Sequence, residues 1–163
     1  MASLQRLIRV LTRLEAGLAV LACSTLVLVL VVDVIAVDVF STAMRGSPQV
    51  GVLSGIVACM LGLTLATGSG AHFRPTFADN VIPYVWIDRV GDAISAALFG
   101  VFAVFAVEFV IQSHAYADRV PVLNVPLWPV QIVVPYVLAS CALKHAVFAV
   151  SPKSKDALSD WAS

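Results

Sequence analysis

Four long runs of apolar residues, nearly free of charge, alternate with shorter polar segments along the chain. The charge-free runs cover residues 16–32, 46–71, 93–107 and 120–143. A membrane hydrocarbon core about 30 Å thick requires about 20 mostly apolar residues in a helix. The second and fourth runs are long enough to cross the membrane. The first and third reach this length when they are extended past one acidic residue near their ends, Asp33 and Glu108 respectively. This pattern predicts an all-α integral membrane protein with four spanning helices, at about residues 15–40, 50–67, 90–112 and 127–150.

Composition agrees with a membrane protein and argues against nucleic-acid binding. Hydrophobic residues make up 60% and charged residues 12% of the 163 residues, and the mean hydropathy is +0.96. Soluble domains carry about 25% charged residues. The formal net charge is zero, whereas nucleic-acid binding requires a concentrated basic surface. We therefore expect a single membrane domain over residues 1–163 that is surrounded by lipid and binds no nucleic acid.

The distribution of basic residues predicts how the spans are oriented. With the N-terminus inside, only Arg45 and Arg119 fall on the outer side. The inner side then carries Arg6, Arg9, Arg13, Arg74, Arg89, Lys144, Lys153 and Lys155. Because cytoplasmic segments carry the excess of lysine and arginine, both termini are expected in the cytoplasm. A basic start before an apolar run is also typical of a signal peptide, but this run is longer than the apolar region of such a peptide.

The segments outside the spans have patterns of their own. Over residues 1–14, leucines recur at helical spacing on one face and arginines on another, as in an arm helix that lies in the membrane surface. A plain cytoplasmic extension of the first span fits this pattern equally well. Aromatic and charged residues mix over residues 72–89, which predicts a second interfacial segment on the cytoplasmic side. Residues 151–163 are expected to form a polar tail.

Small residues form a stripe on the second predicted span. Gly51, Gly55 and Gly62 belong to it, and the first two form a G-x-x-x-G motif. Such stripes allow two helices to approach closely in lipid. The stripe is therefore expected to face another helix, which belongs either to this chain or to a partner. If that helix came from a second copy, the chain would be a self-assembling membrane protein.

Ionisable residues near the span ends allow more than one interpretation. Asp33 is expected near the outer interface, where it is either hydrated or in contact with a partner. Glu108 lies in apolar sequence, where burial of an acid is costly, so it either pairs with a group such as Arg119 or faces a partner. Lys144 near the inner end can extend its ammonium group to the lipid headgroups. In the last span, Pro135 predicts a kink.

The sequence contains no recognisable catalytic motif, so we expect no enzyme activity, metal or cofactor. Cys23, Cys59 and Cys141 lie in different spans and give no disulfide or metal pattern. His72 and His145 both approach the inner face and could together hold a haem, as in the membrane anchor of a respiratory enzyme. Imidazoles exposed to solvent or lipid are the favoured interpretation, and a haem- or quinone-binding anchor is the alternative. The apolar membrane midplane offers no site for a solute or sodium ion, which indicates a structural subunit of a larger complex.

Two local sequences, in their order along the four spans, resemble a known family. Gly70, His72 and Arg74 lie in a turn that reads GAHFR after the second span, and Pro83 follows an amphipathic stretch. Residues 122–135 read VLNVPLWPVQIVVP and place Pro126, Trp128 and Pro135 at the entry to the last span. This arrangement resembles the small membrane subunit, the DctQ-like Q subunit, of tripartite ATP-independent periplasmic (TRAP) transporters. The chain departs from the family pattern at residues 37–40 and 49–52, where an arginine–tyrosine pair and a tryptophan with acidic residues are common.

The resemblance implies a non-catalytic accessory subunit in the bacterial inner membrane. Such a subunit braces a large, multi-span M subunit that moves as an elevator and carries the solute, an organic acid, together with sodium. A periplasmic substrate-binding protein, the P subunit, delivers the solute to this pair. The charged residues expected to help dock the P subunit are Asp38, Arg45, Asp118 and Arg119, for which simple solvation is the alternative. The motif residues Gly70, His72, Arg74, Pro83, Pro126, Trp128 and Pro135 would have structural roles.

Overall fold

The computed structural model describes residues 2–68 and 85–151, and these fold into five helices. The helices are α1 (Ala2–Phe40), α2 (Ser47–Gly68), α3 (Val85–Ala115), α4 (Trp128–Gln131) and α5 (Val133–Val150). Four segments are long and apolar enough to cross a membrane: Ile8–Phe40, Ser47–Gly68, Arg89–Ala115 and Trp128–Val150. For the described residues, the prediction of an all-α fold with four helices long and apolar enough to span a membrane is therefore confirmed.

The first helix is much longer than a membrane crossing requires. Its 39 residues contain no proline and only one glycine, and at 1.5 Å per residue they extend about 58 Å. Residues 2–14 continue into the span without a break, so the arm expected there is not a separate helix. The continuous helix agrees with the second interpretation given above, in which this segment is an extension of the first span. The helix ends before Ser41, which has a positive φ of 50°.

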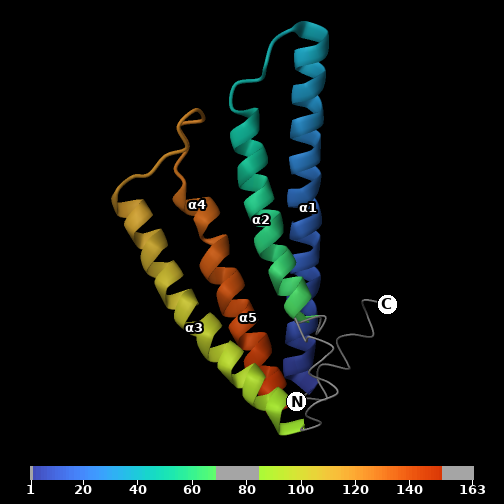
Figure 1. Cartoon of the computed structure of the whole chain (residues 1–163), viewed down its shortest axis with the longest axis vertical. Coiled ribbons are helices and arrows are strands. Elements are labelled where there is room, and N and C mark those ends of the chain that lie inside the picture. Colours follow the sequence, from blue (N-terminus) through green and yellow to red (C-terminus); the bar gives the residue numbers. More distant parts are fainter. Residues whose placement is uncertain (1, 69–84, 152–163) are drawn as a thin grey trace.

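The long helices lie in a row instead of closing into a bundle (Figure 1). The order across the row is α3, α5, α2 and α1, and the contacts between α3 and α5, α5 and α2, and α2 and α1 agree with it. We call the end where α1 begins and α5 finishes the terminal end, and the end with the connections 41–46 and 116–127 the loop end. The pair α1–α2 and the pair α3–α5 approach each other at the terminal end and diverge toward the loop end.

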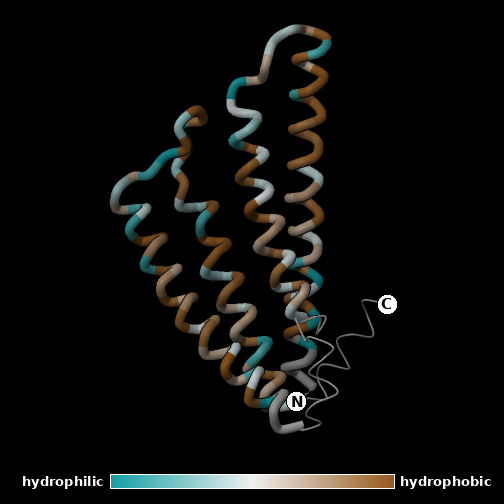
Figure 2. Tube along the Cα trace, in the orientation of Figure 1, coloured by the Kyte–Doolittle hydropathy of each residue, from teal (hydrophilic) through white to brown (hydrophobic). Residues whose placement is uncertain are grey.

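The buried core is small and lies toward the terminal end. One cluster joins Ile8 to Val147 and Phe148, and a second joins Leu61 to Val137 and Cys141. Only 6% of the apolar window of α1 and 6% of that of α3 are buried, against 39% in the last span. Figure 2 shows that hydrophobic residues dominate the long helices. Because the two helices at the edges of the row expose apolar surface on most sides, they must be covered by lipid or by another protein.

The last span is interrupted close to the position that the sequence predicts. Pro135 has no N–H to donate to Gln131, and its ring crowds the carbonyl group of that residue. Helix α4 ends at Gln131, and α5 begins two residues later. Helical bonding resumes where the Tyr136 amide donates to the Ile132 carbonyl at 3.2 Å. The helix is therefore interrupted near Pro135, where the sequence predicts a kink, and the break separates a short α4 from α5.

The small-residue stripe of α2 contacts α1 over only part of its length. A Cβ atom at Gly51 would lie 3.3 Å from Leu30, and one at Gly55 would lie 3.9 Å from Leu26. At Gly62 an added Cβ would meet no atom within 4 Å. Toward the terminal end the buried residues of α2 are Leu61, Thr64, Thr67 and Gly68. Gly62 is not among them, whereas an added Cβ at Gly68 would lie 3.5 Å from Thr12, so α2 approaches α1 closely near both of its ends but not at Gly62.

Candidate functional site

A buried ion pair joins the first and last spans at the terminal end. Lys144 Nζ on α5 lies 2.6 Å from Glu15 Oε2 on α1, and both side chains are 0% exposed. The same ammonium donates to the backbone carbonyl of Thr64 on α2 at 2.9 Å. The expectation that Lys144 extends to the lipid headgroups is therefore wrong. A fully buried cation requires a carboxylate and further acceptors, and Lys144 finds both on neighbouring helices.

The other carboxylate oxygen of Glu15 also receives hydrogen bonds from α5. Ser140 Oγ donates to Oε1 at 2.6 Å, and the Tyr136 hydroxyl donates to the same oxygen at 3.3 Å. Residues 136, 140 and 144 are four apart, so they share one face of the helix. We call Glu15, Thr64, Tyr136, Ser140 and Lys144 the buried polar layer. This layer links α1, α2 and α5 through one ion pair and three hydrogen bonds, which together provide partners for the buried Glu15 carboxylate and the buried Lys144 ammonium.

A second polar pair joins α5 to α3. His145 Nδ1 lies 3.1 Å from Asp92 Oδ1, and the imidazole stacks on the Phe99 ring with centroids 5.6 Å apart. Phe148 packs edge-on against the same imidazole. The expectation that His145 is exposed to solvent or lipid is therefore wrong, because its side chain is only 3% exposed.

Lys144 and His145 show how α5 holds its two neighbours. Consecutive helical residues point about 100° apart. One of the two side chains therefore reaches toward α1 and α2, while the other reaches α3. A further polar contact joins Thr67 Oγ1 to Cys141 Sγ at 3.4 Å, between α2 and α5. Helix α5 is thus the element through which the row is joined at the terminal end.

The buried polar layer and the Asp92–His145 pair hold helices together. The Glu15 carboxylate and the Lys144 ammonium are both enclosed by protein donors and acceptors from three helices. Within residues 2–68 and 85–151, no group of three or more histidine, cysteine, aspartate or glutamate side chains is arranged to hold a metal ion. Cys23 and Cys59 are exposed and Cys141 is buried, each as a free thiol.

At the loop end, the connection 116–127 folds back on itself. The Val120 amide donates to Val125, and Arg119 pairs with Pro126 in an isolated antiparallel bridge. Arg119 Nη1 donates to the Asn124 carbonyl at 3.0 Å and lies 3.3 Å from its side-chain oxygen. Asn124 has a φ of 51°, which asparagine tolerates better than most residues. The guanidinium is thus held in place by its own loop.

The connection 41–46 is tied to both α1 and the second loop. Asp33 Oδ1 accepts a hydrogen bond from the Met44 amide at 3.1 Å, which gives Asp33 a structural role. Gly46 has a φ of 91°, and an added Cβ would lie 2.5 Å from the Leu123 side chain. Only glycine combines this backbone conformation with so close an approach. Gly46 therefore fixes the contact between the two loops.

A groove of about 280 Å³ lies between the start of α2 and the connection 116–127. Its walls include Pro48 and Val52 on one side and Pro121 and Leu127 on the other, with Arg119 also contributing. The groove is mostly apolar and opens where the two helix pairs diverge.

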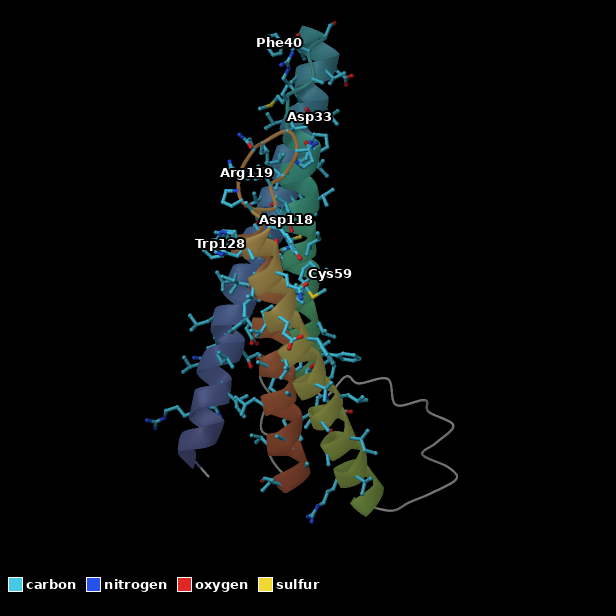
Figure 3. The ribbon with its side chains drawn as sticks, turned by 90° about the vertical axis from the view of Figure 1, so that its left-hand side faces the viewer. Asp33, Phe40, Cys59, Asp118, Arg119 and Trp128 are labelled. Carbon is cyan, nitrogen blue, oxygen red and sulfur yellow. The ribbon has the colours of Figure 1, made fainter. Side chains whose placement is uncertain are left out.

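The four charged residues expected to meet a periplasmic partner are exposed at the loop end. Asp38 lies near the end of α1, Arg45 lies in the connection 41–46, and Asp118 and Arg119 lie in the connection 116–127. Figure 3 shows Asp118 and Arg119 near the level of Trp128, while Phe40 at the end of α1 extends beyond them. The structure therefore places both acidic and basic groups on one end of the molecule.

The suggested pairing of Glu108 with Arg119 does not form within the described part of the chain. Glu108 is exposed on α3, and Arg119 donates to Asn124 instead. Trp128 begins α4, where its ring contacts His114 edge-on with centroids 5.4 Å apart. This contact joins the loop-end parts of α3 and α4.

Several expectations fall on residues outside the described ranges. These are the motif residues Gly70, His72, Arg74 and Pro83, and the polar tail beyond residue 151. Most of the interfacial segment expected over residues 72–89 also lies outside them, while its last five residues are the start of α3.

The sequence reasoning missed the residues that hold the helices together. Glu15, Thr64, Asp92 and Ser140 were assigned no role, and neither was Gly46. A signal was present, because Glu15 and Asp92 lie near the same ends of their spans as Lys144 and His145 lie in theirs. Acidic and basic side chains at similar depth on different spans are candidate partners, but the sequence does not show which helix faces meet.

Comparison with known proteins gives one match. The sequence model of a family described as "Tripartite ATP-independent periplasmic transporters, DctQ component" matches residues 26–152. The matched region contains all of α2, α3, α4 and α5 and the last part of α1. No curated protein and no solved structure matched the chain.

Proposed function

The chain belongs to the DctQ component family of the tripartite ATP-independent periplasmic transporters, and from this membership we propose that it is a scaffold subunit that braces the large membrane subunit. The M subunit of the same transporter would carry the solute and the coupling sodium ions. The DctQ-family chain would perform no catalysis and would bind no cofactor. Its role would be to hold the fixed part of the M subunit while the transport part moves.

The arrangement of polar groups is the observation that supports this proposal most strongly. The buried charges at the terminal end are engaged by protein atoms of neighbouring helices. A solute or sodium site near the membrane midplane would require free oxygen ligands on broken helices. The row of helices instead offers broad apolar faces on α1 and α3. Paired buried charges and exposed apolar faces are better explained by a subunit that packs against a larger protein than by a transport pathway.

We place the terminal end in the cytoplasm and the loop end in the periplasm, with the chain in the bacterial inner membrane. Basic residues of the described terminal end include Arg9, Arg13, Arg89 and Lys144, while Arg45 and Arg119 are at the loop end. The positive-inside rule supports this orientation. With it, the end of α1 beyond Asp33 projects toward the periplasm.

The loop end would help to dock the periplasmic substrate-binding protein. Asp38, Arg45, Asp118 and Arg119 are exposed there and carry both signs of charge. Complementary charges steer association and fix the register of a complex. Because the hydrogen bonds from Arg119 to Asn124 already hold the Arg119 side chain in place, less conformational entropy would be lost when the partner docks.

The family match supports a transporter subunit and gives no support to a haem- or quinone-binding anchor. Among the described residues, His145 contacts Asp92, Phe99 and Phe148. We therefore do not propose the respiratory alternative.

Co-purification tests the proposed function. The chain, carrying an affinity tag, is co-expressed with the large membrane subunit, solubilised in mild detergent and purified through the tag. We expect a stable heteromeric complex in equal proportions. Recovery of the tagged chain alone or only as homo-oligomers, with the large subunit present in the membrane, would contradict the proposal. Gly62→Leu, at the position of the α2 stripe where an added Cβ meets no atom within 4 Å, serves as a control for self-association through that stripe.

A further inference from the structure

One face of α3 is defined by its contact with α5. Asp92, Phe99, Ala106 and Ser113 are seven residues apart, and each is buried or half-buried. Asp92 and Phe99 contact His145 directly. A seven-residue spacing keeps side chains on one side of a helix, so this stripe marks the direction of α5.

Glu108 points the opposite way. It follows Ala106 by two residues, which corresponds to a rotation of about 200° around the helix axis. Because α3 is the edge of the row, this direction leads away from the rest of the molecule. Figure 3 looks along the row from that side.

Glu108 belongs to an exposed stripe with both apolar and polar members. Val101, Phe105, Glu108 and Gln112 follow one another at intervals of four, three and four residues, the spacing of one helix face. Val101 is 53% exposed and Phe105 is 61% exposed, and the two polar members are exposed as well. We call these four residues the outer stripe of α3.

The depth of Glu108 makes its exposure unusual. The ring of Trp128 marks the membrane–water boundary, where tryptophans collect, and it contacts His114 on α3. Glu108 precedes His114 by six residues, or about 9 Å along the helix. The carboxylate therefore lies below the boundary, between apolar neighbours. A carboxylate that faces lipid at this depth is unfavourable unless it meets a cation or hydrogen-bond donors.

The described residues give Glu108 no such partner, since no ion pair or hydrogen bond reaches it and Arg119 is engaged with Asn124. The opposite edge of the row presents a different surface. Helix α1 has no charged residue from Ala16 to Val32, so its exposed middle is compatible with lipid. The two edges of the row are therefore chemically distinct, and of the two only the α3 edge requires a cation or a hydrogen-bond donor from another molecule.

We infer that the outer stripe of α3 is the contact surface for the large membrane subunit, which presents a cationic side chain opposite Glu108. The inference rests on the proposed function and adds the helix and the chemistry of the contact. Phe105 supplies an exposed aromatic side chain, a type that is enriched at protein interfaces. The ion pair fixes the register of the two proteins and removes an unfavourable charge from lipid.

Photo-crosslinking in membranes that contain the co-expressed large subunit tests this inference. A benzophenone amino acid replaces Phe105, or replaces Leu28 on α1 as the matched control, since Leu28 is 63% exposed. We expect adducts with the large subunit from position 105 and few or none from position 28. In the chain labelled at position 105, Glu108→Lys should lower the adduct yield about tenfold through like-charge repulsion, whereas Glu108→Gln should lower it less.

The outcomes separate this inference from the proposed function. Co-purification of the large subunit with no adduct from position 105, adducts only with a second copy of the chain, or equal adducts from positions 105 and 28 would overturn the inference alone. An unchanged yield in Glu108→Lys would exclude the cationic complement. Failure of the unmodified chain to co-purify with the large subunit would overturn both. Because Glu108 is exposed, membrane insertion of its variants, checked by their amount in the membrane fraction, should match that of the unmodified chain.

Discussion

Lys144 and Glu15 form an ion pair 2.6 Å apart with no exposed surface on either side chain, and this pair joins the fourth membrane span to the first. The two residues are 129 positions apart in the chain. Charges so fully buried are stable only when each is balanced by the other and by hydrogen bonds. Ser140, Tyr136 and the Thr64 carbonyl supply those bonds.

Breaking this pair on one side should be strongly destabilising. We expect Lys144→Met to lower the free energy of unfolding by about 3–5 kcal/mol, because Glu15 is left as an unpaired buried charge. Thermal unfolding in detergent micelles measures the effect. The double variant Glu15→Gln with Lys144→Met should recover most of the loss, since no unpaired charge is left. Arg13→Ala, which removes an exposed cation two residues before Glu15, is the matched control, and equal losses in Arg13→Ala and Lys144→Met would contradict the assignment.

Removing the polar link between α3 and α5 should loosen that pair of helices. Asp92→Ala removes the carboxylate that contacts His145 Nδ1 and should cost about 1–3 kcal/mol. Spin labels on α3 and α5 near the terminal end would report a broader distance distribution than in the unmodified chain. Ile94→Ala shortens an exposed side chain on the same helix and should leave that distribution unchanged. A distribution unaffected by Asp92→Ala would show that packing alone holds α3 in place.

Two glycines should respond in opposite ways to the same substitution. Gly46→Ala places a side chain where φ is 91° and where Leu123 lies 2.5 Å away, so we expect a loss of about 1–3 kcal/mol. Gly62→Ala meets open space inside a helix and should stabilise the chain by about 0.5–1 kcal/mol. Thermal unfolding of the two variants side by side gives the comparison. Equal changes would mean that the contact between the loops is absent in the membrane.

Reversing a charge at the loop end should weaken delivery of solute by the binding protein. Asp118→Lys is expected to raise the concentration of loaded binding protein needed for half-maximal uptake, by up to about tenfold at low salt. The maximal rate should change little, because the exposed Asp118 is proposed to act in docking and not in the transport step. Arg89→Ala, an exposed charge near the terminal end, serves as the control. Uptake kinetics identical for Asp118→Lys and the unmodified chain would argue against docking at this loop.

Hydropathy and charge were sufficient to predict the four spans because each span is a local property of the sequence. The break between α4 and α5 was also a local property, since it follows from the chemistry of Pro135. The buried polar layer depends on which faces of three helices meet, and the position of Lys144 at a span end did not reveal this. His145 was misjudged for the same reason, because its carboxylate partner lies on another helix. Gly46 could not be recognised without knowing that Leu123 approaches it.

We propose above all that these helices support transport without conducting solute themselves. Sodium-dependent uptake into proteoliposomes tests it most directly, using as probe the organic acid that most strongly stabilises the purified binding protein. We predict uptake when this chain, the large membrane subunit and the loaded binding protein are all present, and none when either membrane subunit is left out. Solute flux through this chain reconstituted alone, or full uptake without it, would contradict the account.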